Sequence, residues 1–577
     1  MTSTKMKTVK IFSLAFPSSL SSVDSGSYLH IRDVIPDPEN KILLFQKCGV
    51  VSTDTYHNFW PIKKLFSLTN VEFLTVHISG QGKFLIEIFS VVDDDFYITE
   101  KCELSKIIKL GEEYQFKFDI KEGQGLAYVR ITSLEDNNYI YSIELLGNLQ
   151  ELNKIRVSCN ICTFNRQSYV KNFVENVASS FLNNDKIFFR IVNNGNELGF
   201  LLPSNCEVVK NKNTGGAGGF SRGMQLSIQD PLVTHILLAD DDIRLNKEVI
   251  ERTLAFLSIV KKEFSDCFIS GAMLSLDEPW LQYERNSSLS NKGFQPRGSN
   301  LDTCRDRIGV IKDISANPAK GLAGWWYVVM PSKVVKEYGM PLQIFVRGDD
   351  VEYSLRCNRQ NISINGICVW HEPFCKKYNE IMEDYYLVRN MLLISYEFSQ
   401  NYGQLNKVFF VRKFLKNLLI FDYVAAEFNL LAANHLLDGT FKTDPEQLHK
   451  QLMQQLKDKL KGVTQWEGEK VVVYDKYSSK ARKLFYIFLQ HVFGLRKGTG
   501  LSYGGFARRI GNFVGCSKVV TYQGGGKFRE YRFSWKKSSK LLLRFLITSF
   551  LLGKNRDKLS ESALEFRKGF QSEIKQG

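Results

Sequence analysis

Short runs of alternating hydrophobic and polar residues fill the first quarter of the chain, from about residue 9 to residue 148. Residues 83–88 and 114–118 are two such runs, and Gly, Asp and Asn residues separate them from their neighbours. A hydrophobic period of two indicates strands with one buried face, and many short strands between turns indicate an all-β unit. We expect residues 1–150 to form a β-sandwich domain, which serves either as a scaffold or as a sugar-binding module.

From about residue 154 the pattern changes to buried, strand-length runs separated by amphipathic segments. Residues 155–162 and 186–192 are expected to be strands, with a helix over residues 169–182 between them. This alternation is typical of an α/β domain around a mostly parallel sheet, to which we assign residues 151–400. Ligands of such sheets bind at the carboxyl ends of the strands, so the polar loops that follow these strands are expected to form the site.

Helical periodicity dominates from residue 379 onward. The expected helices cover residues 380–398, 405–436, 446–461, 478–494 and 538–552. Because a chain of 577 residues is too long for one hydrophobic core, we assign residues 401–577 to a separate, mainly helical C-terminal domain.

Three consecutive carboxylates follow the apolar run at residues 235–239. Alternate residues of an extended segment point the same way, so Asp240 and Asp242 are expected to converge while Asp241 turns aside. Converging carboxylates repel unless a cation lies between them, and Mg²⁺ or Mn²⁺ suits such oxygen ligands and keeps other positions for phosphates. The alternative is a solvated acidic turn or a helix N-cap.

Two later segments bring further polar side chains to the same sheet edge. Residues 343–346 are expected to be a strand leading into Asp349 and Asp350, which lie in the first turn of a helix, where ordinary N-capping is the alternative. Residues 362–370 are expected to be another strand, ending at His371. A lone histidine is usually structural, but at this edge it could complete a metal site.

Glycine and tryptophan mark two more candidate ligand-binding segments. Residues 215–219 contain four glycines and lead into a helical pattern, which could present amide groups to anionic oxygens or form a structural turn. Residues 277–320 are long, polar and poorly periodic, the kind of loop that often covers a substrate. Trp325 and Trp326 follow; on a strand they would alternate, so that one could face a sugar in a cleft, whereas core packing is the alternative.

Overall composition is ordinary for a globular protein, but the charge is unevenly distributed. The net charge is +15, and residues 401–577 hold 32 Lys and Arg against 14 Asp and Glu. An excess of positive charge in one region is typical of binding to nucleic acid or to an anionic membrane surface. No nucleic-acid-binding module is recognisable, so nucleic acid is not an expected partner. Residues 536–552, with Lys536, Lys537, Lys540 and Arg544 among Leu and Phe residues, resemble an interfacial helix, although packing against other helices is equally compatible.

The cysteines and the ends of the chain give no sign of secretion. The eleven cysteines are scattered, and Cys159 and Cys162 have no second pair at zinc spacing, so they are expected to be buried strand residues. No signal peptide is expected, and the longest apolar stretch, residues 541–552, is shorter than the roughly 18 residues that span a bilayer. We expect a cytoplasmic protein, either soluble or peripheral on the inner face of the cell membrane.

Six motifs are considered together: CTFNR (162–166), NTGGAGGFSRG (213–223), LLADDD (237–242), GWW (324–326), RGDD (347–350) and VWH (369–371). They resemble the inverting family 2 glycosyltransferases of GT-A fold, and among them the galactofuranosyltransferases that build galactan polymers. The motifs cover roughly residues 155–400. The β-sandwich and the helical region match those enzymes by architecture only.

The resemblance implies a role for each matching residue. Those expected to contact the UDP part of the donor are Arg166, Asn194 and Asn213, although residues 192–195 hold amides where relatives often carry an acid and Gln. Asp240 is expected to contact donor and metal, and the further metal ligands are Asp242 and His371. Asp350 is the expected catalytic base. By position alone, the other expected substrate-binding residues are Trp325, Trp326 and Asp349.

The implied activity is transfer of galactofuranose from UDP-galactofuranose to a glycan or lipid-linked glycan, with Mn²⁺ or Mg²⁺ as cofactor, in cell-surface polysaccharide synthesis. Another family 2 transferase, such as a rhamnosyltransferase, is an alternative. So is a non-catalytic glycan-binding protein built on the same fold. The sequence leaves a homo-oligomer open.

Overall fold

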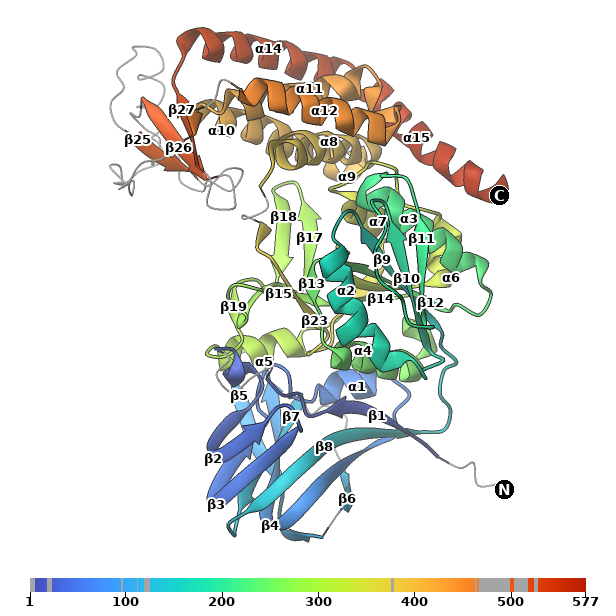
Figure 1. Ribbon diagram of the computed structural model, residues 1–577, viewed down its shortest axis with the longest axis vertical. Coiled ribbons are helices and arrows are strands. Elements are labelled where there is room, and N and C mark those ends of the chain that lie inside the picture. Colours follow the sequence, from blue (N-terminus) through green and yellow to red (C-terminus); the bar gives the residue numbers. More distant parts are fainter. Residues whose placement is uncertain are drawn as a thin grey trace.

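The computed structural model describes residues 6–17, 23–94, 97–111, 113–118, 125–374, 378–461, 464–465, 499–502, 517–522 and 528–576. Figure 1 shows three units in succession along the long axis. Blue strands form one end, a green and yellow unit of strands and helices forms the middle, and orange and red helices form the other end. The helix expected over residues 478–494 lies outside the described residues.

The N-terminal unit is one antiparallel, hydrogen-bonded sheet of eight strands. These are β1 (Lys7–Ser13), β2 (His30–Asp37), β3 (Ile42–Ser52), β4 (Phe73–Asp93), β5 (Ile98–Leu110), β6 (Glu113–Phe118), β7 (Leu126–Ser133) and β8 (Asn138–Leu149). The first half of β4 pairs with β6 and β8, and its second half pairs with β5 and β7. The change occurs at Gly80, where a Cβ atom would lie 2.2 Å from the carbonyl oxygen of Tyr139. Two strand groups therefore share one long strand.

The central sheet has the order β11-β10-β9-β12-β21-β14-β22-β20. Its strands are β9 (Val157–Thr163), β10 (Ile187–Asn193), β11 (Cys206–Lys210), β12 (His235–Asp240), β14 (Phe268–Ser270), β20 (Ala319–Lys320), β21 (Tyr327–Pro331) and β22 (Gln360–Ile362). The first four strands are parallel, as expected, whereas β21 runs antiparallel to both β12 and β14. The helices of this unit are α2 (Gln167–Asn176), α3 (Gly215–Gln229), α4 (Lys247–Ile259), α6 (Ser332–Tyr338) and α7 (Asp349–Cys357). The sheet is thus mixed beyond β12.

The expectation of a long loop over residues 277–320 is wrong. That region contains β16 (Leu281–Glu284), the hairpin of β17 (Asn286–Ser290) and β18 (Gly293–Arg297), β19 (Leu301–Asp302) and α5 (Arg307–Ser315). Strands β16 and β19 belong to a second sheet with β13 (Ile243–Arg244), β15 (Ala272–Ser275) and β23 (Cys368–His371). One of the polar side chains of residues 277–320 forms hydrogen bonds inside the protein. Buried Gln282 accepts a hydrogen bond from Tyr56 Oη at 2.6 Å and donates one to the carbonyl oxygen of Gly298 at 2.6 Å. The polarity of Gln282 therefore reflects buried hydrogen bonds, whereas residues 291, 292 and 294–296 of the hairpin are exposed.

The C-terminal unit is mainly helical. It contains α8 (Leu387–Glu397), α9 (Ser399–Tyr402), α10 (Lys413–Leu419), α11 (Tyr423–Leu437), α12 (Pro445–Leu460), α14 (Trp535–Lys554) and α15 (Arg556–Gln576). A small sheet of β24 (Thr464–Gln465), β25 (Thr499–Ser502), β26 (Lys518–Tyr522) and β27 (Phe528–Arg532) was not expected. The single helix expected over residues 405–436 is broken, because Phe421 has φ 62° and the Asp422 side chain caps α11 by accepting from the amide of Ala425. Among the described helices, none combines the length and apolar character needed to cross a bilayer.

One hydrophobic core runs from the N-terminal sheet into the central unit. Buried polar groups tie the two units as well. Arg252 of α4 donates to the carbonyl oxygens of His57 and Asn365 at 3.1 and 2.9 Å, and the Asn365 side chain donates to the carbonyl oxygen of Phe59 at 2.6 Å. Helix α1 (Ile62–Leu68) lies at this junction in Figure 1. The link between β8 and β9 separates the two units along the chain but does not divide their core.

Candidate active site and metal centre

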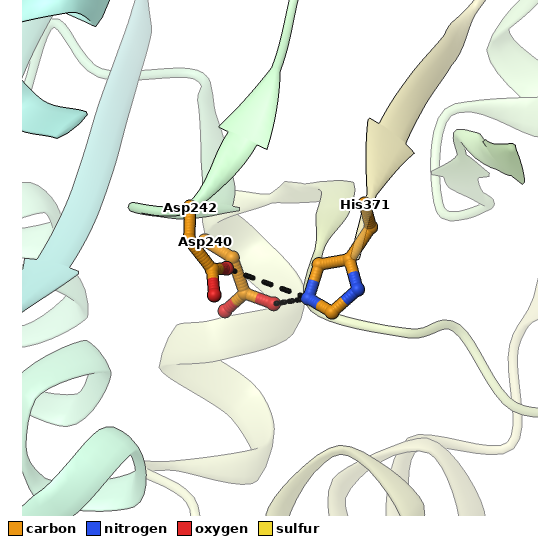
Figure 2. Close-up of side chains that lie close together, drawn as sticks. All are labelled: Asp240, Asp242 and His371. Atoms are coloured by element: carbon orange, nitrogen blue, oxygen red, sulfur yellow. Dashed lines mark ion pairs between the residues drawn. The ribbon is translucent and has the colours of Figure 1, made fainter. Parts of the chain in front are cut away.

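Asp240 and Asp242 meet His371 at the carboxyl end of β12. Figure 2 shows His371 approaching the two carboxylates from a different strand, β23. Its Nε2 atom lies 3.4 Å from Oδ1 of Asp242 and 4.0 Å from Oδ2 of Asp240, and the three ligand atoms all lie within 4.8 Å of one another. The pairing of β13 with β23 accounts for this, because it places Ile243, directly after the acidic loop, opposite His371. The expected convergence of Asp240, Asp242 and His371 is therefore present.

The imidazole of His371 is oriented by its own backbone neighbourhood. Its Nδ1 lies 2.7 Å from the carbonyl oxygen of Glu372, and a carbonyl oxygen can only accept, so Nδ1 donates. In the neutral ring Nε2 then carries the lone pair, and it is Nε2 that faces the carboxylates. Three electron-rich atoms facing one another suit a cation. Two carboxylate oxygens and one imidazole nitrogen fit a divalent ion such as Mn²⁺ or Mg²⁺.

Asp241 turns away from this centre. Its carboxylate accepts a hydrogen bond from Thr163 Oγ1 at 2.7 Å and pairs with Nη1 of Arg166 at 2.9 Å. Burial raises the pKa of Asp241, and the charge of Arg166 opposes that effect. The same Arg166 guanidinium also pairs with Asp242. Arg166, expected to contact the UDP moiety, thus lies at the site and neutralises its acids. Thr163, within the CTFNR motif, is a partner that the sequence did not indicate.

The strand expected over residues 343–346 is absent. Phe345, Arg347 and Gly348 have φ values of 73°, 68° and 90°, which belong to the left-handed region and cannot continue a strand. Helix α7 begins directly after them at Asp349, so both acids lie in its first turn, as expected. Non-glycine residues in this conformation are strained, and strain of this kind concentrates at functional sites.

Asp349 and Asp350 are both affected by burial. Burial raises the pKa of Asp349, and the neighbouring charge of Asp350 raises it further. Burial also raises the pKa of Asp350, while its bond from the amide of Val351 and the charge of Arg347 lower it. Asp350 is the more exposed of the two. A carboxylate with a raised pKa that reaches the surface has the properties of a general base.

The side chains of Asn194, which follows β10, and of Asn213 both contact the start of α3. The buried Asn194 side chain donates to the carbonyl oxygen of Gly215 at 3.0 Å and accepts from the Asn211 side chain at 2.9 Å. Asn213 accepts from the amide of Gly215 at 3.3 Å. Both amide side chains therefore organise the entry into the helix.

Packing explains most of the glycine-rich run. A Cβ atom at Gly219 would lie 2.1 Å from Sγ of Cys162 on β9, and one at Gly215, which has φ 71°, would lie 2.1 Å from the carbonyl oxygen of Phe345. At Gly216 the nearest atom would be Oδ2 of Asp349 at 3.7 Å, an ordinary contact. Gly215 and Gly219 are therefore required by close packing, as the alternative of a structural turn predicted. Gly216 instead lies beside the Asp349 carboxylate.

The two tryptophans lie in a turn before β21, so the expectation that they alternate along a strand is wrong. Trp325 is buried, and its ring contacts Phe220 and Tyr353 at centroid distances of 5.5 and 6.1 Å. Trp326 is half-buried, and its Nε1 donates to the carbonyl oxygen of Gly271 at 2.8 Å. Core packing therefore describes Trp325, whose ring offers no open face to a sugar.

Comparison with known proteins identifies relatives over part of the chain. No protein-family model matches it. The galactofuranosyltransferase GlfT2 of Mycolicibacterium smegmatis is 28% identical over 197 residues, which cover 32% of this chain and 30% of that protein. GlfT2 of Mycobacterium tuberculosis is 28% identical over 217 residues, which cover 34% and 32% of the two chains. The match thus spans about a third of the length of these curated relatives.

Among solved structures, a mannosyltransferase from Pyrobaculum calidifontis in complex with GDP-Man and Mn²⁺ is 11% identical and covers 49% of this chain and 75% of its own, with a TM-score of 0.28. TarS 1-349 of S. aureus in complex with UDP-GlcNAc is 12% identical and covers 50% and 81%, with a TM-score of 0.32. Scores this low do not establish a shared fold. The sequence matches stand without them: over about a third of its length, this chain is related to glycosyltransferases of the galactofuranosyltransferase kind.

Proposed function

We propose that this protein is a metal-dependent, inverting glycosyltransferase of family 2 with a GT-A core, which transfers galactofuranose from UDP-galactofuranose to a hydroxyl group of a glycan or lipid-linked glycan. The observation that carries the proposal is the convergence of Asp240, Asp242 and His371 at one sheet edge. The relation to galactofuranosyltransferases supports the choice of donor sugar.

Metal ligation falls to Asp240, Asp242 and His371, whose Nε2 is directed inward by the bond of Nδ1 to the Glu372 carbonyl oxygen. A bound Mn²⁺ or Mg²⁺ would neutralise the charge that grows on the departing UDP. Arg166 is positioned to add positive charge beside the same oxygens, because its guanidinium already contacts the acids of this loop. Asn194 and Asn213 hold the start of α3, where the positive end of the helix dipole favours a diphosphate.

Asp350 acts as the general base in this proposal. It takes the proton from an acceptor hydroxyl, whose oxygen attacks the anomeric carbon from the side opposite the UDP leaving group. The burial that raises its pKa makes it a better proton acceptor than a solvated aspartate. A single displacement inverts the configuration, and no covalent carboxylate intermediate forms. Asp349 lies beside Gly216 of α3 and is proposed to contact the donor.

Residues 1–150, 151–400 and 401–577 are proposed as a β-sandwich domain, a catalytic domain and a basic helical domain; α8, at the end of the second range, packs with the helices of the third. The helical domain is proposed to rest on an anionic membrane surface through α14, whose outward side exposes the apolar residues Leu543, Leu546, Ile547 and Phe550. Lys536, Lys540 and Arg544 are exposed on the same helix, which contains no acidic residue. In Figure 1, α14 lies at the outer edge of the end farthest from the N-terminal unit. An apolar strip beside basic residues is typical of interfacial helices.

The test is release of UDP from a panel of nucleotide sugars by the purified full-length chain, with Mn²⁺, with Mg²⁺ and after treatment with EDTA. Turnover with UDP-galactofuranose that EDTA abolishes and Mn²⁺ restores is the expected result. Faster turnover with a nucleotide-rhamnose would identify the alternative transferase. Glycan binding without any turnover would favour the non-catalytic alternative.

A further inference from the structure

We propose that Asn390, in the first helix of the C-terminal unit, is a positioning residue for Asp350. This inference rests on the proposed function, because it concerns the base of that reaction. It adds a role for the helical unit in the chemistry. The side chain of Asn390 acts through the strained loop that precedes α7.

The loop is held by side chains and not by a sheet. Nδ2 of Asn390 donates to the carbonyl oxygens of Val346 and Arg347 at 2.8 and 2.7 Å, with that of Ile344 farther away at 3.3 Å. These carbonyl groups belong to the segment in which Phe345, Arg347 and Gly348 take left-handed φ values. Hydrogen bonds to consecutive carbonyl groups stabilise a backbone path that would otherwise cost free energy.

Asn390 is itself held in one orientation. Nε of Arg389 donates to Oδ1 of Asn390 at 2.8 Å, so the amide nitrogen must face the loop. Nη2 of Arg389 donates to the carbonyl oxygen of Ile344 at 2.7 Å. The guanidinium carbon lies 5.5 and 5.0 Å from the ring centroids of Tyr385 and Tyr386, and both Asn390 and Arg389 are buried. The pair forms a rigid clamp, here called the Arg389–Asn390 clamp.

The clamped loop is bonded to α3 and leads into α7, which carries Asp350. The carbonyl oxygen of Phe345 accepts from the amide of Ala217 at 3.0 Å, which ties the loop to the first turn of α3. Gly348 is the N-cap of α7, and a Cβ atom there would lie 3.6 Å from Cβ of Asn390. Asp350 follows two residues later. The conformation of Arg347 and Gly348 therefore sets the direction in which α7 starts and the place of the Asp350 carboxylate.

A base must lie within hydrogen-bond reach of the hydroxyl that it deprotonates, and a displacement of about 1 Å can cost about 10²-fold in rate. Loss of the clamp would free the loop while leaving Asp240, Asp242 and His371 in place, since these belong to other elements. The expected signature is a fall in kcat with little change in donor KM or in Mn²⁺ binding. A residue that merely stabilises the fold would not separate these quantities.

The test compares Asn390→Leu with Asn429→Leu in the full-length chain. Asn429 is a matched control, because it is equally buried in α11 and donates to the carbonyl oxygen of Asp384 at 2.8 Å, away from the loop. We expect Asn390→Leu to lower kcat by about 10²-fold, with donor KM changed less than about threefold. Asn429→Leu should lower Tm by a similar amount and leave kcat of the folded protein unchanged. If Asn390→Leu does not fold, Asn390→Ser, which keeps one donor, takes its place.

Hydrogen exchange of the amides of residues 345–351 supplies a readout that needs no activity. Faster exchange in the Asn390 variant than in wild type and in the Asn429 variant is the expected result. Unchanged exchange together with unchanged kcat would overturn the positioning role while leaving the proposed function intact. Absence of turnover in the wild type would instead refute the proposed function, and the exchange result would then decide whether the clamp exists.

Discussion

Nε2 of His371 faces Oδ1 of Asp242 at 3.4 Å although the two residues are far apart in sequence and neither lies on the strand of the other. The antiparallel pairing of β13 with β23 brings them together, and the Glu372 carbonyl oxygen fixes the ring. Both side chains are buried at the sheet edge, and the His371 ring also contacts the ring of Phe374 at a centroid distance of 5.2 Å.

The variants Asp242→Ala and His371→Ala should therefore each abolish Mn²⁺ binding and metal-dependent turnover. Calorimetric titration with Mn²⁺ and the UDP-release assay measure the two effects. Tm serves as the control, since the variants test the metal site only if the chain stays folded. Full turnover by either variant in EDTA-treated, metal-free buffer would remove both residues from the metal site.

Asp350→Asn should lower kcat by roughly 10²–10⁴-fold, the usual contribution of a general base. The amide keeps the size of the carboxylate and can still accept the bond from the amide of Val351, but it cannot take a proton. UDP affinity should change little. Equal losses of UDP affinity and turnover would make Asp350 a binding group, with Asp349 as the next candidate for the base.

The rate should depend on pH through the raised pKa of Asp350. A base works only when ionised, so kcat should fall as the pH is lowered through that pKa, at a pH above the value of about 3.9 for a solvated aspartate. For Asp349 the pH affects the stability of the fold, and in the opposite direction: a higher pH should be unfavourable. Since burial raises its folded pKa, the folded state holds a proton that the unfolded state has lost, and stability falls as the pH rises between the two values.

The measurement is kcat against pH for the wild type, together with Tm against pH for wild type and Asp349→Asn. The asparagine variant should lose part of the decline in Tm with rising pH. An acid limb centred at the pKa of a solvated aspartate would contradict the assignment of the base to a buried carboxylate.

The glycine-rich run should respond to substitution position by position. Gly219→Ala forces a methyl group against Sγ of Cys162 and should destabilise the protein by about 1–3 kcal/mol, the usual cost of overpacking. Gly216→Ala is the matched control, because its methyl group meets only an ordinary contact with Asp349. Denaturant unfolding compares the two. Equal stabilities would mean that the close approach of α3 to β9 is not what selects glycine.

Vesicle binding tests the exposed face of α14. The full-length chain should sediment with vesicles of phosphatidylcholine and phosphatidylglycerol but not with phosphatidylcholine alone, and binding should weaken with salt, because charges are screened over about 8 Å at physiological ionic strength. Each basic residue near the lipid contributes about 1 kcal/mol. Replacing Lys536, Lys540 and Arg544 with Gln should weaken binding and leave turnover on a soluble acceptor unchanged.

The matched control replaces three exposed lysines with Gln: Lys450 and Lys457 of α12, and Lys461 directly after it. It removes the same charge from the same unit and should bind like the parent. If both triple variants lose binding equally, attraction is general and not centred on α14. If the α14 variant sediments like the parent but changes oligomeric state in ultracentrifugation, the face is a subunit contact.

Local pattern sufficed for the acidic loop and for the strand end at His371, although the one strand predicted over residues 362–370 is two, β22 and β23, in different sheets. Period and spacing placed Asp240 and Asp242 at a strand end and Asp349 and Asp350 in the first turn of a helix, and the structure has both. The strand predicted over residues 343–346 is absent. Their apolar composition favours a strand, but hydrogen bonds from Asn390 and Arg389, more than forty positions away, impose another backbone path. The prediction that Trp325 contacts the substrate is not supported for a related reason: only the fold shows that Phe220 and Tyr353 enclose its ring.

Polar composition misled over residues 277–320 in the same way. Gln282 reads as a loop residue until its partners Tyr56 and Gly298 are known, and Tyr56 belongs to the N-terminal unit. Sequence reasoning therefore succeeds where a residue's role depends on its neighbours in the chain. It fails where distant groups satisfy a buried polar side chain or override a strand preference.

The core shared by the first two units has a consequence for synthesis. The N-terminal sheet is complete once β8 ends at Leu149, but its partner α4 ends only at Ile259, which is 110 residues later. At roughly 5–20 residues per second, a ribosome needs about 5–20 s for that stretch. During this interval the apolar side of the sheet that will receive α4 remains uncovered on the nascent chain. The central unit thus completes the fold of the unit made before it, and chaperones that bind nascent chains have their widest opportunity in that interval.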